Sequence, residues 1–349
     1  MKKSTIQTIK KSSSNFQLSP LNPCVAGIDI GAASIFVCAG FSDGRQEVQE
    51  YLTFTENLKQ MVKWLKKCGI KSVAMESTGV YWIPVYDILS QNGFDVVLVN
   101  AYYLKTVPGK KTDVKDCQWI QQLHAYGLLH GSFRPDNDGV EFRGYVRQRN
   151  RLVELASQQV SLMHKALTQM NVQLNHVISD ITGATGMDII RAIVQGERDP
   201  KILAKYRNSR CRRSEEEIGK ALDGNYREEH LLAIKQALES YDLFHKQVKE
   251  CEMAIERMLK KWEERKKDTD QKKGEEQVGN TSDLLEFETE ESLKRVLGVD
   301  LTDIPGLDVN GIVKIIGEIG TDMTKWPTFK HFASWLGLCP GNKISGVKF

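Results

Sequence analysis

The stretch at residues 25–31, VAGIDIG, decides the fold of the N-terminal part of the chain. It is an apolar strand pattern that carries one carboxylate, Asp29, and a second apolar run, SIFVCAGF, follows the turn at residues 31–33. A carboxylate inside a strand is costly unless it is paired, hydrogen-bonded or bound to a metal ion. Asp29 is therefore the first candidate functional residue.

The chain on the carboxyl side of these two strands alternates between strand and helix patterns. The order of three strands, helix, strand, helix, strand is that of a ribonuclease-H-like sheet, although topology alone leaves other α/β domains open. The further predicted elements are a third strand at 47–54, a helix at 57–67, a buried strand at 71–75, a helix at 80–91 and a fifth strand at 95–99.

Beyond about residue 112 the pattern becomes helical, with long helices predicted at 142–171 and 228–262. Apolar residues recur three and four apart from Tyr241 to Trp262. This spacing predicts a coiled coil between chains or, equally, a helical hairpin within one chain. The segment 264–283 contains one strongly apolar residue, Val278, and predicts a flexible linker.

The predicted fold class is an α/β ribonuclease-H-like (RuvC-like) N-terminal domain, followed by long helices or a coiled coil and a small, mainly helical C-terminal domain. In the C-terminal domain, the apolar residues at 326, 329, 332, 335 and 336 have core spacing and are predicted to pack. The predicted parts are a basic flexible arm at 1–22, the catalytic domain at 23–140, the helical region at 141–263, the linker at 264–284 and the C-terminal domain at 285–349.

Composition excludes several classes of protein. Hydrophobic residues make up 41% of the chain and charged residues 27%, an ordinary globular balance. No apolar run approaches the ~20 residues of a membrane span, and the N-terminus lacks the apolar stretch of a secretory signal. Seven cysteines without a CxxC pair indicate reduced thiols and argue against structural zinc. We expect a cytoplasmic protein, associated with the nucleoid and with no membrane partner.

Basic residues are clustered although the net charge is only +3. Three arginines spaced four apart from residue 143 form one stripe on a helix, and residues 201–213 carry six basic and no acidic side chains. A solvated face is the alternative explanation for each cluster, but together they favour phosphate contact. The predicted nucleic-acid contacts are Lys110, Lys111, Arg143, Arg147, Arg151, Arg210, Arg212 and Arg213.

Three further acids accompany Asp29. Glu76 follows the buried strand KSVAM, and Asp113 and Asp116 are three apart at the start of a predicted helix. Acids in these positions converge in ribonuclease-H-like sheets and repel one another unless divalent cations neutralise them. Two Mg²⁺ (or Mn²⁺) ions ~3.5–4 Å apart would clamp the attacking and leaving oxygens of a phosphodiester. Taken singly, Asp113 could be a helix cap, Asp29 a turn residue and Glu76 a lysine partner.

Several motifs carry a resemblance to a known family. GIDIG, MESTGVYW and KTDVKD closely resemble the N-terminal motifs of the DEDD insertion-sequence transposases (family 110 of insertion sequences), the bridge-RNA-guided recombinases. LTDIPGLDVNGIVKIIGEIG and FKHFASWLGLCPGNKISG resemble the second conserved domain of that family, and ITGATGMDIIRAIVQGERDP resembles its helical middle. The resemblance covers nearly the whole chain beyond the first twenty residues.

This resemblance implies an Asp-Glu-Asp-Asp tetrad, which maps onto the four acids above one by one. It implies a serine nucleophile ahead of a glycine, which maps onto Ser345 in KISG. The implied partners are DNA, a structured guide RNA and further copies of the chain. Relatives have a second glycine and then a basic segment after this serine, whereas Gly346 is followed here by Val-Lys-Phe. We therefore expect a C-terminally truncated member, whose own activity this departure puts in doubt.

Three other functions fit part of the pattern. A RuvC-type structure-specific DNA nuclease would use the same four acids with water as the nucleophile. A catalytically inactive remnant would only bind nucleic acid. A sugar-kinase-like ATPase would use GIDIGAAS as its first phosphate loop, but the KTDVKD helix and the lack of a second glycine-rich phosphate loop argue against it.

Overall fold

The computed structural model describes residues 19–77, 79–100, 113–270 and 285–338, with backbone only at 267–270 and 285–288. The chain divides into two compact units, Met1–Phe133 and Arg134–Phe349. Each unit is described by itself. Lys110, Lys111 and Ser345 lie outside the described residues.

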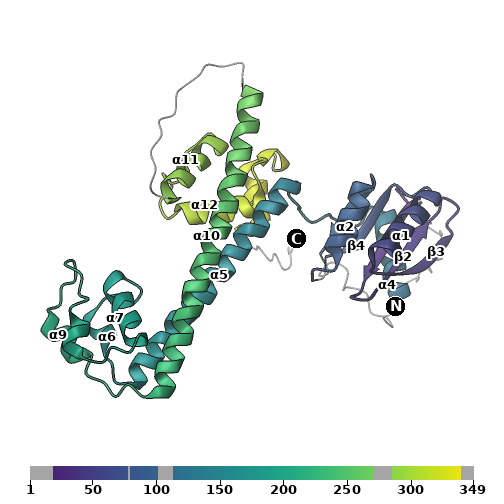
Figure 1. Ribbon diagram of the computed structural model, residues 1–349. Helices are drawn as coiled ribbons and strands as arrows, with labels where there is room; N and C mark the ends of the chain where they lie inside the picture. The colour runs from purple at the N-terminus through teal and green to yellow at the C-terminus, as the bar shows by residue number, and fades with distance from the viewer. Residues whose placement is uncertain (1–18, 78, 101–112, 271–284, 339–349) are drawn as a thin grey trace, which may run out of the picture. The chain divides into compact units, whose positions relative to one another are not determined.

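The first unit is built on a five-stranded mixed sheet with the strand order β3-β2-β1-β4-β5 (Figure 1). Strands β1 (Val25–Ile30), β2 (Ser34–Gly40) and β3 (Gln46–Leu52) are antiparallel neighbours, because short turns join them. Strands β4 (Ser72–Glu76) and β5 (Asp95–Val99) run parallel to β1. The order of strands and helices along the chain is the predicted one, and the mixed five-stranded sheet is consistent with a ribonuclease-H-like domain.

Helices cover the two faces of this sheet. The crossover helices α1 (Thr55–Lys67) and α2 (Trp82–Gln91) share one buried cluster with Ile28 of β1 and Met75 of β4. Helix α4 (Asp113–Ala125) contacts β1, β2 and β4. Because side chains alternate along a strand, the residues one place beyond Ile28 and Met75 point to the α4 face.

The second unit is organised around a long helical hairpin, drawn in teal and green in Figure 1. Helices α5 (Asn137–Gln169) and α10 (Glu228–Asp270) pack against each other in antiparallel directions, since residues at the end of α5 share a core with the start of α10. At the other end, the rings of Phe142 and Trp262 are 4.8 Å apart. The predicted seam is therefore buried, at this end, by a hairpin within the chain, one of the two alternatives left open above.

Helix α10 continues to Asp270, into the segment predicted as a linker from residue 264. The residues concerned, ERKKDTD, are mainly helix formers that extend an existing helix without needing a buried face. None of the described helices, including these two long ones, is apolar enough over a sufficient length to cross a membrane.

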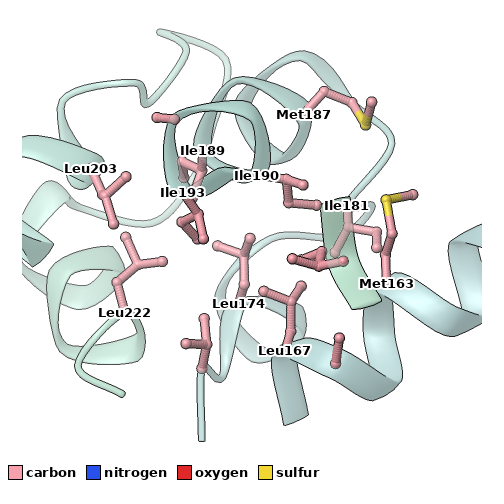
Figure 2. Packing of buried hydrophobic residues seen from close by; sticks show 14 of the residues in the cluster. Met163, Leu167, Leu174, Ile181, Met187, Ile189, Ile190, Ile193, Leu203 and Leu222 are labelled. Carbon is pink, nitrogen blue, oxygen red and sulfur yellow. The ribbon is translucent and has the colours of Figure 1, made fainter. Parts of the chain in front are cut away.

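A small helical tip closes the hairpin between α5 and α10. Its core joins Met163 and Leu167 of α5 to Ile189 and Ile193 of α7 and to Leu222, as Figure 2 shows. The tip contains α6 (Leu174–Val177), α7 (Ala184–Val194), α8 (Pro200–Ala204) and α9 (Glu215–Ala221).

The other end of the hairpin carries the C-terminal helices. Ile312 and Ile316 of α12 pack with Phe142 of α5 and Leu259 of α10 in one cluster. The elements are α11 (Leu285–Leu297), α12 (Val309–Ile319), the 3-10 helix η1 (Met323–Lys325) and α13 (Phe329–Trp335).

The prediction that the apolar residues at 326, 329, 332, 335 and 336 form a packed core face is wrong for three of them. Within the described part of the chain, Phe329 is 78% exposed, Trp335 42% and Leu336 44%. Trp326 instead contacts Phe332 and Trp335, with ring centroids 5.1 and 5.2 Å apart. A helix of two turns packs its aromatic rings on one another here, and helical spacing alone does not tell such a cluster from a core.

Candidate active site

Helix α4 approaches β1 unusually closely because residue 27 is glycine. A Cβ atom at Gly27 would lie 2.2 Å from the backbone nitrogen of Gln121 and 2.4 Å from the carbonyl oxygen of Cys117. Real Cβ contacts are essentially never shorter than 3.0 Å. Only glycine therefore lets the backbone of α4 rest directly on the strand that carries Asp29.

A second contact fixes the direction of α4. Near its end, His124 Nε2 lies 2.9 Å from Ser72 Oγ at the beginning of β4. The middle of the helix contacts Gly27, and β1 and β4 are parallel. Helix α4 therefore runs opposite to both strands, so that its first turn, with Asp113 and Asp116, lies toward their carboxyl ends.

Asp29 and Glu76 lie at those carboxyl ends. The strand register pairs Ile28 with Met75, so the next residue of each strand is an acid, and both acids point to the α4 face. Both side chains are partly exposed. The fold thus brings together, on one side of the sheet, the four acids that the sequence singled out.

The pKa of Asp29 is consistent with the same arrangement. Its pKa is raised from 3.8 to about 6, first by burial and then by the negative charges of Asp116, Asp113 and Glu76, in that order. A backbone hydrogen bond at Ile30 opposes this rise. Because the pKa of Asp29 is raised by the charges of three other carboxylates, all three lie close enough to act on it electrostatically. The four acids therefore repel one another while no cation is bound.

The four side chains suit a hard divalent cation, because carboxylate oxygens are the ligands that Mg²⁺ and Mn²⁺ prefer. Among the residues that the structure describes, however, no three His, Cys, Asp or Glu side chains stand in a ready-made coordination geometry. The donor set fits a metal, and the side chains would close around it on binding.

Two buried thiols lie beside the acids, and no motif in the sequence singles them out. Cys38 pairs with Gly27 across β1 and β2, and Cys117 follows Asp116. Both are fully buried. A hydrogen bond with Cys38 and burial raise the pKa of Cys117 far above its ordinary value, and the charge of Asp29 adds to this. The Cys117 thiol stays protonated, and both buried side chains pack α4 against the sheet.

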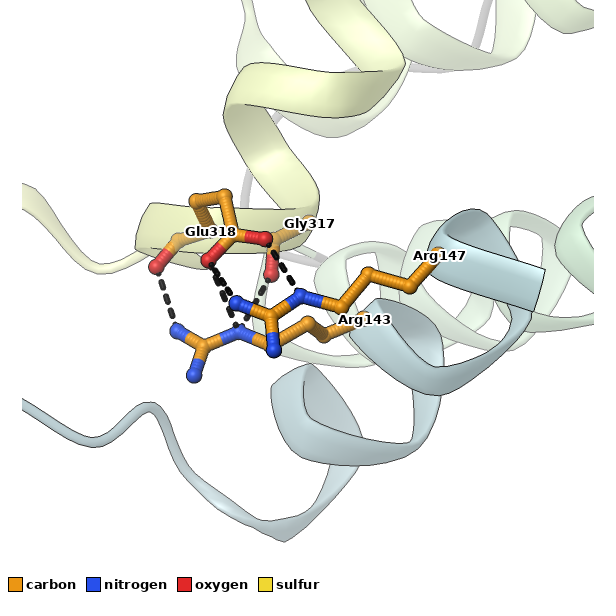
Figure 3. Close-up of polar contacts among 4 residues, drawn as sticks. All are labelled: Arg143, Arg147, Gly317 and Glu318. Carbon is orange, nitrogen blue, oxygen red and sulfur yellow. Dashed lines mark hydrogen bonds and ion pairs between the residues drawn. The ribbon is translucent and has the colours of Figure 1, made fainter. Parts of the chain in front are cut away.

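The first two arginines of the predicted basic stripe are used inside the chain (Figure 3). Arg143 donates hydrogen bonds to the carbonyl oxygens of Gly317 and Glu318, at 3.0 and 2.6 Å. Arg147 donates two bonds of 2.8 Å to the Glu318 carboxylate. The two guanidinium groups hold the C-terminal end of α12 against α5 and do not form the free basic stripe that was predicted.

The other predicted basic contacts that the structure describes lie at the surface. Arg151 is exposed on α5. Arg210, Arg212 and Arg213 are exposed in the loop before α9, and Arg213 pairs with Glu217 at 3.0 Å.

Two family models match the chain. Residues 26–172 match the model for DEDD transposases of the IS110 type, described as a transposase, and this match contains all four acids. Residues 298–348 match the model described as the transposase IS116/IS110/IS902 family, and this match contains Ser345. Together the two matches cover more than half of the chain. A comparison with curated proteins gave no match.

Proposed function

The chain belongs to the IS110 family of transposases, and we propose that Asp29, Glu76, Asp113 and Asp116 form its divalent-metal site for cutting and rejoining DNA. Membership makes the protein a DNA transposase or recombinase of an insertion sequence. The metal site, the serine nucleophile and the guide RNA go beyond membership and belong to the proposal.

One observation carries the metal site. Helix α4 lies antiparallel to β1 and β4 on the Gly27 side of the sheet, which directs its two first-turn acids to the strand ends that hold the other two. The rise in the pKa of Asp29 is the electrostatic consequence of that placement. A structural role does not need four carboxylates in one another's field, since such a cluster costs stability when no metal is bound.

The two pairs of acids would play different parts. Asp29 and Glu76 extend from paired strands and would supply ligands from a rigid base. Asp113 and Asp116 lie on the first helical turn and would close over the site from the other side. Bound Mg²⁺ or Mn²⁺ supplies Lewis-acid activation of the DNA phosphate. The chain's own task is to hold the four acids in position for that phosphate.

The nucleophile is proposed from the family motif. Ser345 stands in KISG, where the family has its nucleophilic serine, and lies within the matched segment. Its hydroxyl would lose its proton and form the new bond to a DNA phosphorus, while the bridging DNA oxygen leaves and takes up a proton. The same resemblance supports a RuvC-like catalytic domain, a structured guide RNA and a homo-oligomeric assembly as further parts of the proposal.

Replacement of Asp116 tests the metal site. Asp116→Asn keeps the shape of the side chain and removes its charge, so we expect cleavage of supercoiled DNA with Mg²⁺ and guide RNA to fall at least about 100-fold. The matched control is Glu56→Gln, which neutralises an exposed acid in the first turn of α1. As a readout independent of activity, Mg²⁺ should raise the melting temperature of the parent and of the control, but not of Asp116→Asn. Cleavage or Mg²⁺ stabilisation at the parental level in Asp116→Asn would refute the site.

The fate of the cut strand tests the serine. A DNA adduct that survives denaturation and disappears in Ser345→Ala supports the serine mechanism. Free nicks that persist in Ser345→Ala would support the nuclease alternative, in which water is the nucleophile.

A further inference from the structure

A cavity of about 750 Å³ lies in the helical tip, within the second unit. It is lined by residues of the loop at 208–213, of the first turn of α7 and of the segment 176–180. The basic side chains of its lining are His176, Arg210, Arg212 and Arg213. Asp180 is the acid among the lining residues, so the wall has an excess of positive charge.

The arginine loop is held in shape by its own hydrogen bonds. The Arg207 guanidinium donates to the carbonyl oxygens of Cys211 and Arg213 and closes the loop. The backbone nitrogen of Asn208 donates to Thr185 Oγ1 at 2.9 Å, which ties the loop to α7. The apolar core beneath it (Figure 2) holds α7 in place, because Ile189 and Ile193 are fully buried. The positive groups are therefore presented by a fixed frame.

The charged side chains of the cavity differ in whether they form ion pairs or hydrogen bonds within the chain. No carboxylate of the described residues pairs with the guanidinium group of Arg210 or Arg212, whereas Arg213 pairs with Glu217. The Asp180 carboxylate accepts hydrogen bonds from the backbone nitrogen and the hydroxyl of Thr182, each at 2.8 Å. The acid thus accepts hydrogen bonds within its own turn, and among the described residues neither arginine has a carboxylate in ion-pair distance.

The first turn of α7 adds hydrogen-bond donors to the lining of the cavity. Its N-cap residue is Gly183, and no side chain caps the helix. The nearby Thr185 hydroxyl already accepts from Asn208. Uncapped backbone N–H groups at a helix N-terminus favour an anion, and they supplement the arginines here.

We infer that this tip cavity binds a phosphate of a nucleic-acid backbone, through Arg210 and Arg212 and the first turn of α7. The inference rests on the proposed function, because nucleic acid is the polyanion that a DNA recombinase binds. Arginine and backbone N–H groups bind phosphate oxygens without reading base sequence, so the cavity serves as a positioning contact. Target DNA and guide RNA offer the same phosphodiester, and the experiment distinguishes them.

The test measures the salt dependence of binding with two probes, a fluorescent 20-base-pair DNA duplex and a fluorescent RNA hairpin. Arg210→Gln/Arg212→Gln should weaken binding of at least one probe about 10-fold at moderate salt. It should also flatten the slope of log affinity against log salt by roughly one unit per lost phosphate contact. The probe that loses affinity identifies the source of the phosphate.

Lys220→Gln/Arg227→Gln is the matched control. It removes the same charge from exposed residues near the tip that pair with Glu216 and Glu229 and do not line the cavity. The control should keep the parental slope. Equal slopes for the cavity variant, the control and the parent, with both probes, would overturn the inference. A cavity variant no weaker than the control would overturn it too.

The same assay separates this inference from the metal site. Asp116→Asn should bind both probes in the absence of Mg²⁺ with the parental salt slope. If Asp116→Asn cleaves normally while the cavity variant has a flatter salt slope, the proposal of the metal site is wrong and that of the cavity is supported. If the cavity variant keeps the parental salt slope while Asp116→Asn stops cleaving, only the proposal that the cavity binds phosphate is wrong.

Discussion

Gly27 of β1 and Gln121 of α4 meet backbone to backbone, and a methyl group at Gly27 would come within 2.2 Å of the Gln121 amide nitrogen. Gly27→Ala must therefore lift α4 from the sheet and displace Asp113 and Asp116 from the strand ends. We expect the variant to lose the increase in melting temperature that Mg²⁺ gives the parent. Overpacking of this kind costs about 1–3 kcal/mol of stability, to be measured by chemical denaturation.

Gly40→Ala is the control for this substitution. A Cβ atom there would meet Gln121 Nε2 at 1.9 Å, which is the end of a flexible side chain rather than backbone. Gln121 can rotate away, at the cost of its 2.6 Å hydrogen bond from Gln46. Gly40→Ala should keep the response to Mg²⁺. Loss of that response in both variants, or in neither, would contradict the role given to Gly27.

Asp29 predicts how the stability of the metal-free protein changes with pH. Its pKa is about 6 in the folded chain against 3.8 ordinarily, so the folded state binds the proton more tightly. The stabilisation is fully present below about pH 4 and is lost as the pH rises through 6. Because the side chain is partly exposed, we expect a loss of about 1–2 kcal/mol. The free energy of unfolding of the parent should decline over this pH range, and that of Asp29→Asn should not. Identical pH profiles for the two proteins would contradict the prediction.

The cluster as a whole predicts that removal of one charge stabilises the protein without metal. Asp116 is the acid with the largest charge effect on Asp29. Asp116→Asn should therefore raise the melting temperature in the presence of a chelator at pH 8. Glu56→Gln, away from the cluster, should leave it unchanged. A lower melting temperature for Asp116→Asn would indicate that its charge is compensated within the chain.

The sequence was sufficient to predict the sheet and its acids because both depend on local patterns. Apolar runs, turn residues and the spacing of acids at the ends of segments are visible in one pass along the chain. Gly27 carried a signal as well, since a glycine inside an apolar strand marks a close backbone approach. That signal does not say which segment approaches, and the partner Gln121 is almost a hundred residues away.

The basic stripe could not be interpreted from the sequence for the same reason. Spacing places Arg143 and Arg147 on one side of α5 but says nothing of the element that covers that side. Their partner Glu318 lies more than 170 residues further along the chain. Three-and-four spacing in α10 likewise predicts a buried seam but does not choose between a second chain and α5. Long-range packing decided each of these questions.

Arg143 and Arg147 give the last prediction, which separates structural arginines from nucleic-acid contacts. The Arg143 side chain is 19% exposed and donates to two carbonyls at the C-terminal end of α12, where a positive charge also interacts favourably with the helix dipole. Arg143→Gln should destabilise this docking by about 1–3 kcal/mol, seen as faster amide hydrogen exchange in α12. Arg147 is 64% exposed and pairs with Glu318 near solvent, so Arg147→Gln should cost less than about 1 kcal/mol. Neither variant should change the salt slope of DNA binding. A flatter slope with unchanged exchange in α12 would reinstate the two residues as phosphate contacts and contradict the structural role.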